Sequence, residues 1–303
     1  MPTIYHTYAS VSTLRDYLAG TSYSSNWTAD TVSLRRILQS GSRRMDSYVG
    51  GGLLTSWGPY TQTRYFDVGM GSYLLNDPRI IGPSGSLMPS DKIINTVPLG
   101  SWCNAITSVT SYSGTDRATS ETLTEGYAND YFLEPYSSDP KLFLKMNIDS
   151  TKSLSSGQQT LAIAGTWGWQ NTTKDTTTLS ALISSTTATT ITVTAATDLS
   201  EGNTVLIGTE QMYVQSISGT TLTVIRGVHG STATTHSNGA DLAVYTYPED
   251  VVQVCLDLGH IIYRDRDIGF SDRVAKAPEE DTKNALNNLD SYAAHTQTSG
   301  AIF

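Results

Sequence analysis

The spacing of apolar residues along the chain predicts two long amphipathic helices, over residues 28–49 and 251–266. In both segments apolar residues recur at steps of three and four, which is the period of one face of an α-helix. A shorter helix is predicted over residues 10–19, and a terminal helix over 278–295. Because the two long helices are similar in length, each offers the other a partner for its apolar face.

Between the two long helices lie short runs that are typical of β-strands. The first run, at 63–76, contains Gly69 and Gly71 and predicts a hairpin. Further strand candidates, separated by Pro, Gly, Ser and Asp clusters, lie at 99–112, 127–135, 142–149 and 161–169. Together they predict a small mixed or antiparallel sheet beside the helices.

The composition changes abruptly between Trp169 and Pro248, where Thr, Ser, Gly and β-branched residues dominate. Strand-like runs bounded by Gly, Ser and Asn occur at 188–194, 203–208, 210–218, 220–227 and 241–247. Short strands at this spacing predict a compact β-barrel or sandwich of about five or six strands. The sequences on either side read as a consecutive strand and helix once this stretch is removed, so its two ends should lie close together.

These patterns predict an α+β fold in two domains. The outer domain, residues 1–170 and 247–303, is expected to be a helical core with a small β-sheet, and it carries a C-terminal docking segment at 268–303. The inner domain, residues 171–246, is expected to be an all-β insertion, a barrel or a sandwich.

The composition is that of a folding chain, with 38% hydrophobic and 16% charged residues in 303 positions. A formal net charge of -9 disfavours a surface that grips phosphates, but it suits a channel past which DNA slides without adhering. We expect Cys103 and Cys255 to be buried free thiols, because two cysteines cannot build a disulfide framework or a four-ligand zinc site. The first residues lack the pattern of a signal peptide, and no window approaches the roughly 18 apolar residues of a membrane span, so we expect synthesis in a cytoplasm.

Candidate chemistry is sparse in the sequence. The histidines do not fall into a metal-ligand spacing, and each is expected to be structural or solvated: His6, His229, His236, His260 and His295. No nucleophile elbow or phosphate-binding loop occurs, and the acidic groups at 265–267 and 279–281 are typical of helix ends. We therefore expect a protein without enzymatic activity, cofactor or metal.

The basic residues concentrate in one helix, at Arg35, Arg36, Arg43 and Arg44. One interpretation is a solvated face that pairs with acidic neighbours of the same chain. The other is a contact with an acidic partner subunit.

The terminal helix carries a narrow apolar stripe formed by Leu286, Leu289 and Tyr292, and the chain ends at Ile302 and Phe303. Such a stripe after the core has closed either docks on another protein or packs on its own core.

Four segments in the outer domain resemble the head-tail connector, or adaptor, proteins of tailed bacteriophages. They are VSLRRILQSGSRRMDSYVGG (32–51), TRYFDVG (63–69), AIAGTWGW (162–169) and YPEDVVQVCLDLGHIIYRDRD (247–267). In that family a helix, a TRYFD-like strand, a strand that ends in a Trp-Gly-aromatic corner and a second helix follow in this order. The insert is similar to a small β module of phage structural proteins, and its marks here are 208–212, 226–231, His236 and Gly239.

The resemblance implies a helical connector core that assembles into a homo-oligomeric ring, a dodecamer in the typical case. Such a ring lies at the virion neck between the portal protein and a downstream stopper, nozzle or tail tube, after assembly in the bacterial cytoplasm. DNA passes through its lumen without sequence-specific binding, and no membrane is involved. The family also implies that the terminal segment reaches the portal, here through Leu286, Leu289, Tyr292, Ile302 and Phe303.

The role of the insert is open at this stage. It is either a decoration that stiffens the ring or a module that binds carbohydrate or a host surface. The second interpretation leads to an alternative function, a tail-associated adhesin, for which only Tyr213, Tyr245 and Tyr247 would be available to stack on sugars. A hydrolase is the third and weakest possibility.

Overall fold

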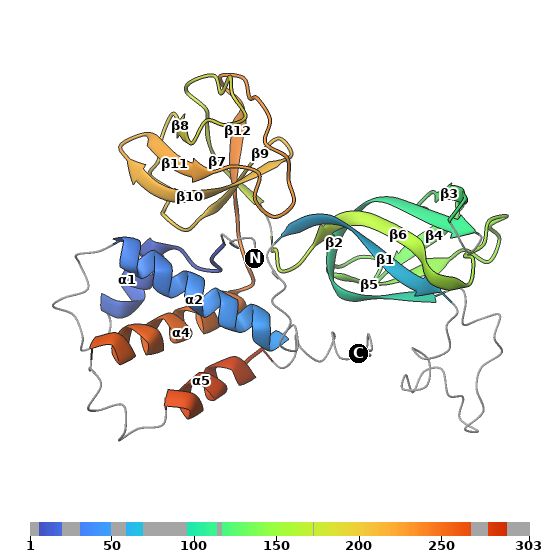
Figure 1. Cartoon of the computed structure of the whole chain (residues 1–303), viewed down its shortest axis with the longest axis horizontal. Coiled ribbons are helices and arrows are strands. Elements are labelled where there is room, and N and C mark those ends of the chain that lie inside the picture. The colour runs from blue at the N-terminus through green and yellow to red at the C-terminus, as the bar shows by residue number, and fades with distance from the viewer. Residues whose placement is uncertain are drawn as a thin grey trace. The chain divides into compact units, whose positions relative to one another are not determined.

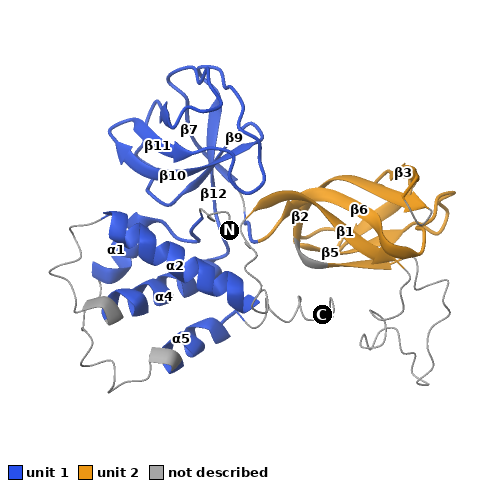
Figure 2. Ribbon diagram, in the orientation of Figure 1, with its two compact units in different colours: residues 1–58, 169–291 blue, residues 59–168, 292–303 orange. Residues whose placement is uncertain are grey.

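The computed structural model describes residues 6–19, 31–49, 59–68, 96–113, 117–171, 173–267 and 278–289. Its helices and strands are drawn in Figure 1. The chain forms two compact units: residues 1–58 and 169–291 make unit 1, and residues 59–168 and 292–303 make unit 2 (Figure 2).

Unit 1 contains the helices of the described chain, at the predicted places. They are α1 (Val11–Ala19), α2 (Thr31–Val49), α4 (Glu249–Asp267) and α5 (Pro278–Asn287). The expected pairing of the two long helices is confirmed, because α2 packs on α4, and α1 packs on both. Gly41 of α2 lies at this contact, where a Cβ at its position would be 3.5 Å from Leu258 Cβ, an ordinary van der Waals distance.

The insert forms a six-stranded antiparallel sheet that also belongs to unit 1, in the order β7-β12-β9-β10-β11-β8. Its strands are β7 (Thr173–Thr178), β8 (Thr190–Thr192), β9 (Thr204–Ile207), β10 (Glu210–Ser218), β11 (Thr221–Ile225) and β12 (Asp241–Tyr245). Leu179 and Val193, just beyond β7 and β8, form a bridge that brings the two ends of the sheet together. The predicted compact β module is confirmed, and its closure leaves little free strand edge.

The two ends of the insert lie side by side, as predicted. Thr173 at the start of β7 is the register partner of Tyr245 at the end of β12, and Asn171 N donates to Thr246 O at 2.8 Å. The insert also contacts the first residues of the chain, since Val11 N donates to Glu201 O at 3.0 Å.

Unit 2 is a second six-stranded antiparallel sheet, in the order β1-β6-β2-β5-β4 with β3 paired to β2. Its strands are β1 (Tyr60–Val68), β2 (Thr96–Ser113), β3 (Thr119–Leu123), β4 (Tyr131–Glu134), β5 (Lys141–Met146) and β6 (Gly157–Trp167). Every member of its core cluster comes from a strand or a loop, and the most buried are Leu99, Cys103, Val109, Leu144, Leu161, Ile163 and Trp167. The sheet therefore buries its own core.

The prediction of an α+β fold built on a helical connector core is wrong. The chain is mostly β, with 40% of residues in strands and 24% in helices, and it contains two antiparallel sheets, one of them a half-barrel. The amphipathic helices gave the stronger sequence signal because their period is regular over several turns. The 18-residue strand β2 is rich in Ser and Thr, and the bulges in its pairing interrupt the alternation that identifies a strand.

The boundaries of the compact units differ from the predicted domain boundaries. The compact units are cut at residues 58/59 and 168/169, so the helices and the β insert fall in one unit and the other sheet forms the second. The first arm of the hairpin expected at 63–76 lies in β1, which pairs with β6, and the turn and second arm of that hairpin lie outside the described residues.

Candidate functional site

Helix α2 presents a basic stripe, which we define as Val32, Arg36, Ser40, Arg43 and Arg44. All five residues are exposed, Val32 to 42%. At 3.6 residues per turn they fall within about 120° of the helix circumference. Within the described part of the chain no carboxylate forms an ion pair with the three guanidinium groups. The stripe is therefore a cationic surface that faces solvent in a single copy.

The fourth arginine of this helix has a different position. Arg35 is half-buried, and its Nη1 donates to the backbone oxygen of Gln215 on β10. One turn further along, Gln39 Nε2 donates to Tyr213 Oη at 3.1 Å. Arg35 thus attaches α2 to the β insert, whereas the partner-contact role expected for Arg36, Arg43 and Arg44 stays a prediction.

A group of buried polar side chains joins the first residues of the chain to α2. His6 Nε2 lies 3.1 Å from Asp46 Oδ2, and Tyr8 Oη donates to Asp46 Oδ1. The exposed fractions of His6, Tyr8 and Asp46 are 1%, 1% and 2%. Burial, and secondarily the Asp46 carboxylate, raises the pKa of Tyr8 well above its ordinary value, so the phenol stays protonated and remains a donor.

The insert contributes His229 to this group. His229 Nδ1 lies 2.9 Å from Gln211 Oε1, and its ring is edge-on to His6 at 5.6 Å between centroids. Burial, and secondarily the nearby His6, lowers the pKa of His229 well below its ordinary value. His229 is therefore neutral at physiological pH.

A His–Asp pair beside a tyrosine has the residue types of a proton-transfer site. Here the three side chains are almost completely covered by protein, so a substrate could not reach them in this conformation. Their geometry fits a structural role, in which they hold the N-terminal segment against α2 and the insert. This pairing cannot be predicted from local sequence, because His6 and Asp46 are far apart in the chain and meet only through the fold.

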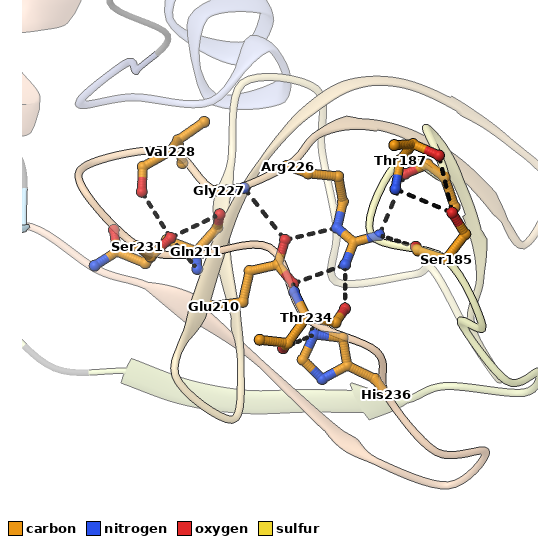
Figure 3. A network of polar contacts seen from close by, with 11 residues as sticks. Ser185, Thr187, Glu210, Gln211, Arg226, Gly227, Val228, Ser231, Thr234 and His236 are labelled. Atoms are coloured by element: carbon orange, nitrogen blue, oxygen red, sulfur yellow. Dashed lines mark hydrogen bonds and ion pairs between the residues drawn. The ribbon is translucent and has the colours of Figure 1, made fainter.

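A second buried cluster lies inside the insert and centres on Glu210 (Figure 3). Arg226 makes a bidentate ion pair with its carboxylate, at 2.6 Å from Nε and 2.7 Å from Nη2, and His236 Nε2 donates to it at 2.8 Å. The backbone N–H groups of Gly227 and Thr234 donate to the same carboxylate at 3.2 and 2.9 Å. Five donors therefore converge on one side chain whose exposed fraction is 0%.

All N–H groups of the Arg226 guanidinium are hydrogen-bonded within the protein. Its remaining N–H groups donate to the backbone oxygens of Ser185, Ala188 and Thr234 at 3.2, 3.3 and 2.5 Å. Burial by itself raises the pKa of Glu210, but hydrogen bonds from Arg226, Thr234 and His236 outweigh it and hold this pKa below its ordinary value. Because the Glu210 carboxylate and the Arg226 guanidinium are satisfied by the protein, the cluster fixes the long loops of the insert, and neither of these two groups is left for a ligand.

The tyrosines considered for sugar stacking are also inside the protein. Tyr213 is 0% exposed, and Tyr245 and Tyr247 are each 7% exposed. Their faces are covered, so they do not form a stacking platform.

The C-terminal helix α5 packs on α4 of the same chain. Leu289 is 0% exposed and Leu286 is partly exposed, while Arg264 Nη2 lies 3.0 Å from Asp281 Oδ2. The apolar stripe is thus covered at Leu289. The docking role of this segment stays a prediction, and Tyr292, Ile302 and Phe303 lie outside the described residues.

The prediction of buried free thiols is confirmed. Burial raises the pKa of Cys103 to about 12 and that of Cys255 to about 11, so neither thiol is activated as a nucleophile. Among the described residues, no three His, Cys, Asp or Glu side chains are grouped so that they could hold a metal ion. In the same ranges, no helix combines the length and the apolar character needed to cross a membrane.

Comparisons with models of protein families, with curated proteins and with solved structures find no match to this chain. The resemblance to head-tail connectors consequently stays a prediction that rests on the four sequence segments.

Proposed function

We propose that this protein is a structural virion protein that forms a ring between the portal and the tail of a bacteriophage. The ring extends the DNA channel and is the attachment platform for the next component of the neck or tail. The observation that supports this proposal most is that the four segments of the resemblance form two pairs: α2 packs on α4, and β1 pairs with β6.

The second pair has specific contacts between the TRYFDVG and AIAGTWGW segments. The Arg64 guanidinium stacks over the Trp167 ring at 4.5 Å from its centroid, and the Phe66 ring lies 5.9 Å from Trp167. Trp167 is 0% exposed and its Nε1 donates to Gln62 O at 3.1 Å. These motif residues therefore form one packed cluster, which gives a physical reason for their occurrence together.

The polar chemistry of unit 1 also supports a mechanical role. Both buried clusters, around Asp46 and around Glu210, connect segments that are separated in sequence, which fits a structural role. The net charge of -9 suits a lumen that must not retain DNA.

The test is to mix the purified protein with portal from the same phage and to image the product by negative-stain electron microscopy. We expect a ring with a central hole that is stacked on the portal. A protein that neither binds portal nor joins purified virion necks, and that binds host glycans instead, would favour the adhesin and contradict the connector.

The C-terminal segment is tested by a truncation that ends at Leu289. This variant keeps α5 and the Leu289 contact but removes Tyr292, Ile302 and Phe303. We expect it to keep the thermal stability of the full chain and to lose most portal affinity. Unchanged affinity would exclude these three residues as the portal contact and would move attention to Leu286.

A further inference from the structure

Unit 2 carries an exposed apolar tip at one end of the β4–β5 hairpin. Tyr127, just before β4, is 86% exposed, and Ile148, just after β5, is 88% exposed. Asn147 Nδ2 donates to Tyr127 O, so the two loops that carry these side chains are joined. The tip therefore carries one aromatic and one aliphatic side chain that are both exposed to water.

The tip is rigid because its loops are fastened to the buried residue Asp130. The Asp130 carboxylate accepts from Thr124 N at 2.8 Å, from Ser150 Oγ at 3.0 Å and from Lys152 Nζ at 2.9 Å. Asn147 N donates to Asp130 O at 2.8 Å. Binding of a partner therefore costs the loops of the tip little conformational entropy. Rigid aromatic and aliphatic anchors are the usual hot spots of interfaces.

The rim of the tip is acidic. Glu125 and Asp149, both exposed, belong to the same two loops as Tyr127 and Ile148. A complementary surface would present an apolar contact within a basic rim. The basic stripe of α2 has this composition, since exposed Val32 is followed along one face by three arginines.

We propose that the tip of one copy docks on the basic stripe of α2 of a second copy. This inference rests on the proposed ring and names its subunit contact. The two patches are different surfaces of one chain, so the contact is heterologous and repeats from copy to copy, and a rotation that closes gives a ring.

The test uses two charge-reversed variants of the full chain. The first, Glu125→Arg/Asp149→Arg, has a basic tip and a basic stripe. The second, Arg36→Glu/Arg43→Glu/Arg44→Glu, has an acidic tip and an acidic stripe. We expect the wild-type protein to self-associate in sedimentation velocity experiments, alone or with portal rings as template, and each variant alone to stay monomeric.

An equimolar mixture of the two variants should recover assembly, because every contact in an alternating ring is again between opposite charges. If the mixture assembles, both variants are folded, and their failure to assemble alone is due to loss of charge complementarity. If the wild-type protein stays monomeric in both conditions, or assembles while the variants assemble equally well, or the mixture does not recover, the inference is overturned.

The apolar part is tested by Tyr127→Ala/Ile148→Ala, which should weaken self-association at least about tenfold. Tyr136→Ala is the matched control, because Tyr136 is 79% exposed at the other end of the same hairpin and should leave association unchanged. Equal effects of the two changes would contradict the tip as the contact.

Disulfide cross-linking tests which residues of two copies lie close together at the contact. Ile148→Cys and Ser40→Cys proteins, mixed and oxidised, should give a disulfide-linked heterodimer, whereas a Tyr136→Cys and Ser40→Cys mixture should not. The native thiols are buried and do not compete. Portal binding is measured separately on the same samples, so a connector that binds portal without this contact refutes the inference and leaves the proposed function standing.

Discussion

Substitution of Glu210 should open the β insert. In the Glu210→Ala protein the Arg226 guanidinium, whose side chain is 6% exposed, loses its counter-charge while it stays enclosed by backbone oxygens. Removal of one member of a buried ion pair typically costs about 3–5 kcal/mol. The N–H groups of Gly227 and Thr234 also lose their acceptor. Each one that water does not reach adds about 1–3 kcal/mol to the loss of stability. Glu210→Gln keeps the shape and one acceptor oxygen, so its cost should lie at the lower end, near about 3 kcal/mol.

Hydrogen exchange followed by mass spectrometry measures this cost locally. If the amides of β9, β10 and β11 exchange through opening of the insert, the loss of about 3–5 kcal/mol from the ion pair alone accelerates them by about two to nearly four powers of ten, and the unpaired N–H groups add to this. The control is Asp198→Asn, an exposed carboxylate of the same module, which should change stability by less than about 0.5 kcal/mol. Exchange in Glu210→Ala that is as slow as in the wild type would refute the view that this cluster fixes the insert.

Three further predictions follow from single residues. The pKa of His229 is lowered in the folded state, so just below the ordinary pKa of about 6.5 only the unfolded state binds a proton at this residue. The free energy of unfolding should therefore decrease as the pH falls below this value, by up to about 1.4 kcal/mol per pH unit. Urea titrations at several pH values should give a smaller slope for His229→Gln, and an equal slope would contradict the assignment. Gly165→Ala should destabilise unit 2 by about 3 kcal/mol or more, because its Cβ would lie 2.2 Å from Ala105 O, and a thermal melt like that of the wild type would argue against this close strand approach. Gly41→Ala should instead stabilise the protein by about 0.5–1 kcal/mol, because the added Cβ makes an ordinary contact with Leu258 and favours the helix; a lower melting temperature would exclude this.

The parts of the fold that could be predicted from the sequence are those fixed by local periodicity. The apolar faces of α2 and α4 predict these helices, and the turn at Gly219, whose φ is 59°, predicts the β10–β11 hairpin. The predominance of β-sheet over helix could not be predicted in the same way. The unit 2 sheet depends on pairing between distant strands, such as Tyr60 with Trp167, and the spacing of residues in one strand does not report its partner.

The candidate site shows the same limit. The arginines of α2 were identified from composition, but only the structure separates the half-buried Arg35 from the exposed stripe. The pairing of His6 with Asp46 lies beyond sequence reasoning, because nothing local in the sequence marks a buried partner. The exposure of Ile148 likewise depends on which loops the fold leaves uncovered.

The position of α4 in the chain determines the order in which the protein can fold during synthesis. Helix α2 ends at Val49 and its partner begins at Glu249, so the apolar face of α2 leaves the ribosome long before its cover exists. Meanwhile β1 and β6, and then β7 and β12, bring the first and last residues of the unit 2 sheet and of the β insert together. Both modules can thus close before the helices meet, and the helical contact becomes the last step of folding. A nascent chain that stops before α4 would keep the part of this face that α4 covers open to chaperones, so α4 must be synthesised before that part is buried.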